Sequence, residues 1–192
     1  MSTVQPPRNK IINCGGHDAR QGLSIWAECQ DCEVTGTLSY YNGWDGTETT
    51  HGHGFYLQTK QTGDSRLYRQ NISFRNFSHG YHSYGSSAAF NNNTTYLNNF
   101  GYDNGGLPIP TASGRGFLIA GTSVFQNDTI TGNAIFNNDV YLGWTNWPNN
   151  SVTNSSATSN RFSMNRMTLD HILIPGGITV GGAGNLPNKF TY

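Results

Sequence analysis

Hydrophobic residues alternate with polar or aromatic residues in four short segments of the chain, and each segment begins with a glycine. The segments are Gly22–Glu28, Gly54–Lys60, Gly80–Ser86 and Gly116–Thr122. The first and third positions after the glycine are mostly apolar, as Phe55 and Leu57 are, and the position between them varies. A period of two predicts a β-strand with one face turned inward, because successive side chains of a strand point to opposite sides. We therefore expect four related strands, each with outward-facing positions.

Asparagine recurs in a second set of segments, which align with one another without a gap. These are Val34–Asn42, Tyr68–Asn76, Tyr96–Asn104, Ile130–Asn138 and Ala157–Asn165. One column of the alignment holds Thr37, Asn71, Asn99, Asn133 and Asn160, and a second column holds Asn42, Asn76, Asn104, Asn138 and Asn165. An amide that stacks on an identical amide about 4.8 Å away can donate and accept along the stack. The columns therefore predict buried asparagine ladders, because a lone buried amide is costly.

Repeats of this length decide the fold class. The steps between Asn71, Asn99, Asn133 and Asn160 are 28, 34 and 27 residues, which suits coils of a solenoid whose insertions form loops. We predict an all-β fold: a single-stranded, right-handed parallel β-helix of roughly five to six coils with internal Asn ladders. Residues 1–192 form one domain, either entire or as a fragment of a longer solenoid. An antiparallel sandwich is the alternative, but it leaves the asparagine columns unexplained.

Four stretches carry a resemblance to a known superfamily: His17–Gly22, Tyr40–Trp44, Gly52–Tyr56 and His82–Ser87. They resemble the pectate-lyase-like superfamily, and within it the bacterial right-handed parallel β-helix repeat proteins. The resemblance spans roughly residues 10 to 166. It implies the β-helix fold and a setting at the cell surface or outside the cell. The superfamily includes polysaccharide lyases, glycoside hydrolases, esterases, tailspikes and non-enzymatic adhesins, so the fold alone does not define the activity.

Composition narrows the choice of partners. Only 11% of the residues are charged and the formal net charge is zero, which argues against nucleic acid as a partner, since binding it needs a basic surface. Aromatic residues make up 12% of the chain, more than a disordered chain would carry. No apolar run approaches the ~20 residues of a membrane span, and no signal peptide opens the chain. We expect a carbohydrate polymer as the partner.

The predicted site follows from the alignment of the glycine-led strands. Stacking places Gln21, His53, His79 and Arg115 in one column, and it brings Trp26, Tyr56, His82 and Tyr84 to the same flank. Aromatic faces with polar tips suit sugar rings. The predicted catalytic residues are His53, Tyr56, His82 and Arg115, and the predicted substrate-binding residues are Trp26, Gln58, His79, Tyr84 and Lys60. The alternative is that these aromatic side chains only pack under neighbouring loops.

The type of chemistry stays open in the sequence. A hydrolase needs two carboxylates about 5 to 9.5 Å apart, and no pair of acidic residues has a diagnostic spacing. A lyase needs a base, for which His53 or Tyr56 is a candidate. It also needs a cation, for which the candidates are Lys60, Arg115 and Arg20. His51, His53, His79 and His82 form a second cluster in the same alignment. His51 and His53 offer two metal ligands, for which the third candidates are Asp18, Glu28 and Asp45. We assign no metal residues, and calcium remains the divalent cation to consider.

Two further features bear on function. Cys14, Cys29 and Cys32 are an odd number, so they cannot all pair within the chain; we favour structural thiols over a disulfide or a metal. Exposed coil ends could pair with further strands. The second functional hypothesis is therefore a structural surface or fibre protein, a homo-oligomer that associates through its coil ends.

Overall fold

The computed structural model describes most of the repeat region. The described residues are 9–29, 31–43, 51–59, 65–85, 89–105, 114–121, 125–142, 152–153, 155–163, 167–168 and 179–180. They contain 22 strands and no helix.

The strands form three long sheets and a short fourth one, in which every strand pair is parallel. Sheet A consists of β1 (Lys10–Ile12), β4 (Cys32–Thr35), β7 (Arg66–Arg69), β11 (Thr94–Leu97), β15 (Thr129–Thr131), β19 (Ser156–Thr158) and β22 (Thr179–Val180). Sheet B consists of β2 (Gly15–His17), β5 (Leu38–Tyr40), β8 (Ile72–Phe74), β12 (Phe100–Tyr102), β16 (Ala134–Phe136) and β20 (Arg161–Ser163). Sheet C consists of β3 (Leu23–Ile25), β6 (Phe55–Leu57), β9 (Tyr81–Gly85), β13 (Arg115–Gly121), β17 (Asp139–Leu142) and β21 (Met167–Thr168). The short sheet consists of β10 (Asn91–Asn92), β14 (Phe125–Gln126) and β18 (Val152–Thr153).

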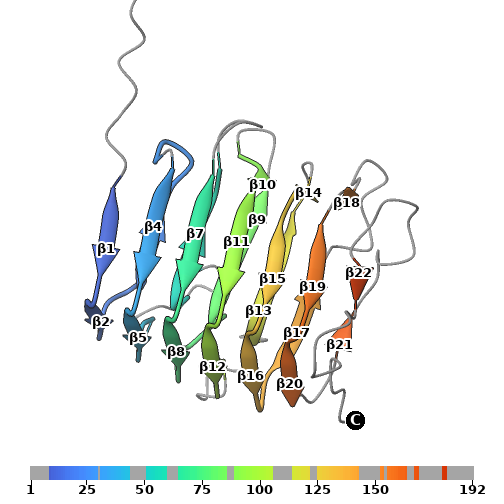
Figure 1. The fold of residues 1–192 in the computed structure, drawn as a ribbon. Coiled ribbons are helices and arrows are strands. Elements are labelled where there is room, and N and C mark those ends of the chain that lie inside the picture. Colours follow the sequence, from blue (N-terminus) through green and yellow to red (C-terminus); the bar gives the residue numbers. More distant parts are fainter. Residues whose placement is uncertain are drawn as a thin grey trace, which may run out of the picture.

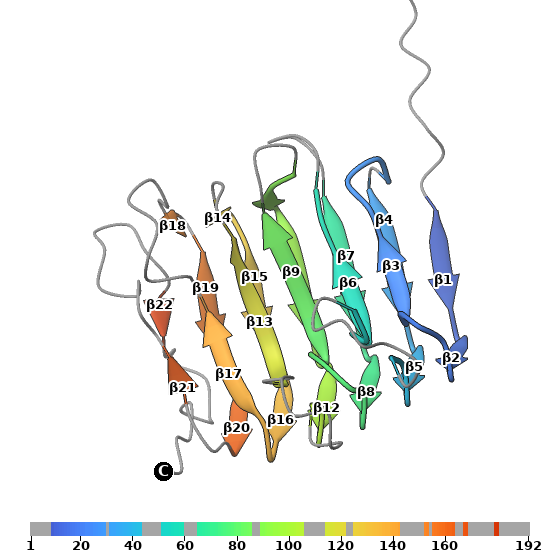
Figure 2. The same cartoon turned by 180° about the vertical axis from the view of Figure 1, so that it is seen from behind.

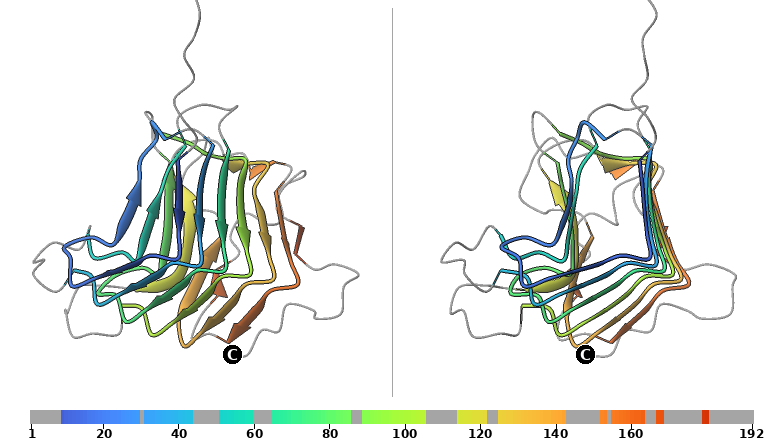
Figure 3. Two further views of the ribbon diagram at one scale, coloured as in Figure 1. Left: turned by 60° about the vertical axis from the view of Figure 1, so that its left-hand side comes forward. Right: turned by 90° about the vertical axis from the view of Figure 1, so that its left-hand side faces the viewer.

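The chain winds through sheets A, B and C in that order and then repeats, as Figures 1 and 2 show from two sides. Viewed from the β1 end, each turn runs clockwise and moves away from the viewer, which makes the solenoid right-handed (Figure 3). Six coils contribute a strand to all three long sheets, and β22 continues sheet A beyond them. The predicted β-helix is confirmed, and the antiparallel sandwich is wrong because the sheets are parallel.

Each corner between sheets A and B contains a residue in the left-handed region of φ. Gly36, Gln70, Asn98, Gly132 and Ser159 have φ between 53° and 66°. Each directly precedes a member of the first asparagine column. A single residue with positive φ turns the chain sharply, and the following side chain then points into the solenoid.

Those asparagines of both columns that the structure describes are buried and bonded from coil to coil. Asn99 illustrates the pattern: its Nδ2 donates to Asn133 Oδ1 (3.0 Å) and to the Tyr68 carbonyl (2.8 Å), and its Oδ1 accepts from Asn71 Nδ2 (3.0 Å). Its backbone N–H also donates to Asn133 Oδ1. Asn71, Asn99 and Asn133 are at most 1% exposed, as the ladder interpretation predicted. Every bond crosses between coils, so the ladder stabilises the register of the stack.

The second column lies at the corner between sheets B and C and forms the same ladder through Asn42, Asn76, Asn104 and Asn138. Asn165, its predicted last member, lies outside the described residues. This ladder explains one glycine column, because a Cβ added to Gly80 would lie 2.7 Å from Asn104 Nδ2 and 2.8 Å from the Gly116 carbonyl oxygen. Glycine at the entry to sheet C therefore lets the ladder pack against the backbone.

The core is a set of stacked apolar side chains inside the solenoid. Phe55 stacks on Tyr81 with ring centroids 5.0 Å apart, and Tyr68 stacks on Tyr96 at 5.7 Å. All four side chains are fully buried. Phe55 and Tyr81 occupy the inward positions that the period of two predicted. Among the described residues, no helix is long and apolar enough to cross a membrane.

One prediction about the cysteines is wrong. Cys29 and Cys32 form a disulfide across the turn between β3 and β4, with their Cα atoms 6.0 Å apart, and only Cys14 is a free thiol. The turn is closed by a hydrogen bond from the Cys29 N–H to the Trp26 carbonyl. That bend brings two cysteines three residues apart within the span that a disulfide needs, which the spacing alone did not establish.

Candidate functional site

The column that precedes the glycines of sheet C is brought into register by backbone hydrogen bonds between coils. The N–H groups of Gly22, Gly54 and Gly80 donate to the carbonyls of His53, His79 and Arg115, at 2.8 to 2.9 Å. This places the members of the column at the same corner of successive coils: Gln21, His53, His79 and Arg115. The alignment predicted this column.

The outward column of sheet C lies beside it. Tyr56 pairs with His82, and His82 pairs with Leu118, in the register of β6, β9 and β13. His53 and Tyr56 are three residues apart, yet their rings stack at 5.6 Å and 15°. Both rings therefore lie on the same side of the solenoid, an arrangement for which the sequence suggested a bend at Gly54.

Three histidines form the centre of this flank, and we call His53, His79 and His82 the histidine cluster. The rings of His53 and His79 are stacked at 4.9 Å and 5°, and the ring of His82 meets both edge-on at 4.4 and 4.8 Å. His53 is 1% exposed and His79 is 8% exposed, whereas His82 is half-buried. Residues from two coils thus meet in one compact group.

The hydrogen bonds of the cluster define its tautomers. The backbone N–H of His79 donates to Nδ1 of His53 (3.3 Å), so the proton of a neutral His53 must be on Nε2. His53 Nε2 lies 3.0 Å from His82 Nδ1 and therefore donates to it. The proton of His82 is consequently on its own Nε2. The backbone N–H of Arg115 likewise donates to His79 Nδ1 (3.2 Å).

Burial favours the uncharged form of two of these rings. It lowers the pKa of His79 and of His82 well below the usual range, and the neighbouring histidines and the Arg115 guanidinium lower both further. Burial also raises the pKa of the Tyr56 hydroxyl, with a smaller contribution from Tyr84. His79 and His82 are therefore neutral imidazoles, and Tyr56 is a protonated phenol, beside the positive charge of Arg115.

Two buried donors at this flank have no hydrogen-bond partner within the described part of the chain. They are Nε2 of His82 and Nε of Arg115. The Arg115 guanidinium lies over the ring of Tyr141, with its Cζ 4.0 Å from the ring centroid. Unpartnered buried donors cost free energy, and a ligand that supplied an acceptor to them would offset that cost.

The remaining predicted residues surround the cluster. Trp26 is 60% exposed and meets Tyr56 edge-on at 5.6 Å, while Tyr84 meets His82 at 5.8 Å. Gln58 is 7% exposed, and its Nε2 donates to the Tyr56 hydroxyl (3.0 Å) and the Tyr84 carbonyl (3.1 Å). Gln58 therefore positions the Tyr56 hydroxyl and connects it to the backbone of the next coil.

Lys60 lies outside the described residues. Tyr141 is a site residue that sequence reasoning missed. It follows Leu118 in the outward column of the next coil, but β17 lacks the glycine that marked β3, β6, β9 and β13.

The histidine cluster is also the group of potential metal ligands among the described residues, with ligand atoms within 4.8 Å of one another. It contains no carboxylate, so it does not suit calcium, which takes oxygen ligands. A transition metal needs imidazole lone pairs, but the Nδ1 atoms of His53 and His79 each accept a backbone N–H, which leaves protons on their Nε2 atoms. The donor set therefore does not fit a metal in this arrangement.

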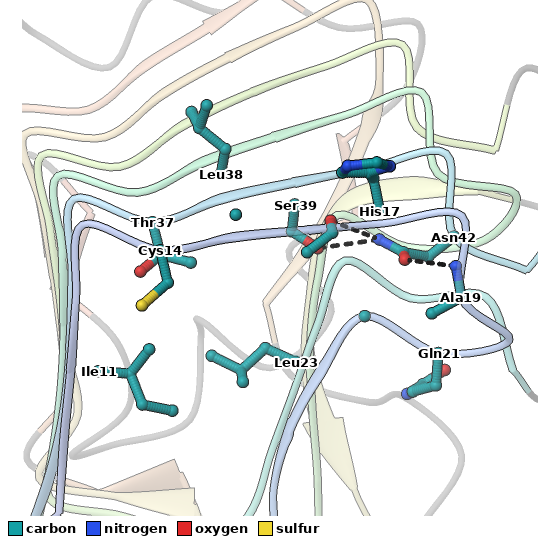
Figure 4. A pocket seen from close by; sticks show the side chains of 13 residues that line it. Ile11, Cys14, His17, Ala19, Gln21, Leu23, Thr37, Leu38, Ser39 and Asn42 are labelled. Atoms are coloured by element: carbon teal, nitrogen blue, oxygen red, sulfur yellow. Dashed lines mark hydrogen bonds between the residues drawn. The ribbon is translucent and has the colours of Figure 1, made fainter.

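A concave region lies at the β1 end of the solenoid. It has a volume of about 290 Å³ and is lined in part by Ile11, Cys14, Leu23 and Leu38. Figure 4 shows Ile11 and Leu23 within this first coil. Ala19 donates its backbone N–H to Asn42 Oδ1, and here the second ladder ends without an amide side chain. The hollow is an open end of the core and lacks the donors of the sheet C flank.

The topology defines the class of protein: a right-handed parallel β-helix. No family model and no curated protein matches the sequence. Among solved structures, the chain is similar to the crystal structure of pectate lyase Pel9A, with a TM-score of 0.47 and 15% sequence identity. The similarity covers 91% of this chain and 47% of that one, so the chain spans about half the length of that structure.

Proposed function

We propose that the protein binds an acidic polysaccharide along the outer flank of sheet C. The observation that carries this proposal is the pair of unpartnered donors, His82 Nε2 and Arg115 Nε. A carboxylate or sulfate oxygen accepts hydrogen bonds from such groups, and the guanidinium supplies the compensating charge.

The aromatic residues around this pair suit the rest of a sugar chain. Trp26, Tyr56 and Tyr84 come from three successive coils, and a sugar ring presents apolar faces that pack on aromatic side chains. The coils repeat about every 4.8 Å along the solenoid, so equivalent positions form a row. A polymer lying along that row would contact several coils.

The chemistry of the described residues favours binding over cleavage. His53 and His82 use their Nδ1 lone pairs as acceptors and carry protons on Nε2. Tyr56 keeps its proton because burial raises its pKa. Within the described part of the flank, these groups are donors, and β-elimination needs a base. We therefore propose a binding protein that acts at the cell surface or outside the cell, where such polymers occur.

The alternative is self-association through the coil ends. The observation in its favour is the open, largely apolar hollow at the β1 end, beside strands β1, β2 and β3, which end their sheets. The described residues show no occupant of this hollow, so association stays a prediction.

Binding to a panel of soluble polymers tests the main proposal. We expect polygalacturonate or alginate to bind and their methyl-esterified or neutral counterparts to bind at least tenfold more weakly. Arg115→Met should weaken binding by tenfold or more, because it removes a charge-assisted bond worth about 1.5–3 kcal/mol. Arg75→Met, which removes an exposed arginine bonded to the Tyr41 hydroxyl, is the matched control. Equal binding of neutral polymers, or full affinity of Arg115→Met, would overturn the proposal. An increase in ultraviolet absorbance from unsaturated products would show that the protein is a lyase, and the proposal of a protein that only binds would then be wrong.

A further inference from the structure

The histidine cluster is a directed chain of hydrogen bonds with a defined beginning. It begins at the backbone N–H of His79, which can only donate. That amide donates to Nδ1 of His53, and His53 Nε2 in turn lies 3.0 Å from Nδ1 of His82. Neither link can be reversed while His53 is neutral, because a neutral imidazole carries one proton.

We propose that His53 is a positioning residue, which holds His82 as the neutral tautomer with its proton on Nε2 and so makes His82 an obligatory hydrogen-bond donor toward the ligand. His53 is almost completely buried. Both of its ring nitrogens take part in the hydrogen bonds from His79 N–H through His53 to His82, which we call the relay. It therefore acts on the ligand only through His82. The identity of the ligand rests on the proposed function, but the state of His82 in the free protein does not.

The relay has consequences for what the site accepts. A donor at His82 Nε2 favours an oxygen acceptor and repels a cation. Arg115 strengthens the preference, since its guanidinium is close enough to lower the pKa of both His79 and His82. The same three histidines that resemble a metal site by proximity thus form a site for an anionic oxygen. The two interpretations differ in which nitrogen carries the proton.

His79 supports the arrangement in a second way. Its ring stacks on His53 at 4.9 Å, which fixes the plane of the His53 ring. Its own Nδ1 accepts the Arg115 backbone N–H, so successive coils repeat one motif in which an imidazole accepts the amide of the next coil. Register between coils, which the asparagine ladders stabilise, therefore sets the direction of the relay.

Nitrogen-15 NMR of the imidazole rings in the free, full-length chain tests the proposal. We expect His53 and His82 each to show one protonated nitrogen, Nε2, and a coupling through the hydrogen bond between His53 Nε2 and His82 Nδ1. The chain contains six histidines, so single substitutions assign the signals. His82 protonated on Nδ1 would overturn the proposal.

Two variants separate positioning from a structural role. His53→Leu removes the donor to His82. The ring signals of His82 should then change from those of a single tautomer to those of two tautomers in exchange. His53→Gln keeps an N–H near the position of Nε2 and should restore the single tautomer. If His53→Leu lowers the midpoint of thermal unfolding but leaves the His82 signals unchanged, His53 is structural and the proposal fails.

Zinc chloride and polygalacturonate, added separately, complete the test. Zinc should leave the three sets of ring signals in place, and metal-induced shifts at His53, His79 and His82 together would overturn the relay in favour of a metal site. Polygalacturonate should shift the His82 Nε2–H signal. If the free protein shows the relay but polygalacturonate does not shift the His82 signal, the proposed function is wrong and the inference about His53 still holds.

Discussion

The outer faces of sheets B and C are both rich in aromatic side chains, but the rings are arranged differently on the two. On sheet B, Tyr40, Phe74 and Tyr102 stack nearly parallel, with centroids 4.9 and 5.0 Å apart and interplanar angles of 9° and 4°. On sheet C, Tyr56 and Tyr84 meet His82 nearly edge-on, at 74° and 63°. The same coil spacing thus produces a closed stack on one face and an open cluster on the other.

The difference shows how to separate a structural aromatic column from a binding one. Parallel stacking follows from planar side chains at the same position of successive coils, and the stacked rings cover one another's faces. Sheet B therefore offers mainly ring edges to a ligand. On sheet C, the column changes residue type from coil to coil, and two donors remain without partners. The stacked rings of sheet B are explained by their contribution to stability. The sheet C flank has two unpartnered buried donors, whose cost in free energy a ligand could offset.

Substituting Asn104 should have the largest effect, because both flanks depend on the ladder between sheets B and C. Asn104 Oδ1 accepts from the backbone N–H and the Nδ2 of Asn76, and Asn104 Nδ2 donates to the Ser73 carbonyl. Asn104→Leu leaves these buried groups unpaired and should lower the free energy of unfolding by about 3 kcal/mol. Denaturant titration measures the loss. A change below about 1 kcal/mol would show that the ladder does not stabilise the stack.

Phe74→Ala tests the sheet B column. The ring stacks on both neighbours and is half-buried, so its removal should lower the free energy of unfolding by about 2 kcal/mol. Affinity for polygalacturonate should stay unchanged when measured below the unfolding transition. If Phe74→Ala lowered the affinity for polygalacturonate without changing the free energy of unfolding, sheet B would contact the ligand and the distinction between the flanks would be wrong.

Asp128 gives the smallest effect and extends the comparison to the interior. Its Oδ1 accepts the Thr94 N–H (2.7 Å), as a ladder amide would, but Oδ2 is buried without a partner. Burial raises the pKa of this carboxyl well above its usual range. Its contribution to stability is therefore complete below the unfolded pKa of about 3.9 and is lost as pH rises through the folded pKa.

Asp128→Asn should remove this loss. An amide can serve the same acceptor role and donate from Nδ2, so the variant should be more stable than the parent by about 1 kcal/mol at neutral pH. The difference should shrink as pH falls, in unfolding curves recorded from pH 3 to 7. Asn133→Asp is the converse control, because it introduces a carboxyl into a ladder and should destabilise the protein as pH rises. A difference independent of pH would rule out the carboxyl as its cause.

Much of the fold could be predicted because each coil of a solenoid repeats the same pattern of residues. The asparagine columns and the glycine-led strands each repeat once per coil, so aligning them predicted which residues become neighbours, His53 and His79 among them. Tyr141 was missed because its strand lacks the leading glycine. The Cys29–Cys32 disulfide was missed because it depends on the local bend of one turn.

The sequence by itself determined the stack: which positions face inward, which amides form ladders and which side chains share the sheet C flank. These follow from a period of two along each strand and from one repeat per coil, and both periodicities can be seen in the amino-acid sequence. Only the tertiary structure decided the direction of the hydrogen bonds within the histidine cluster. The proton positions depend on which backbone N–H faces Nδ1 of His53, a contact between two coils whose geometry depends on the bends at the corners of the solenoid.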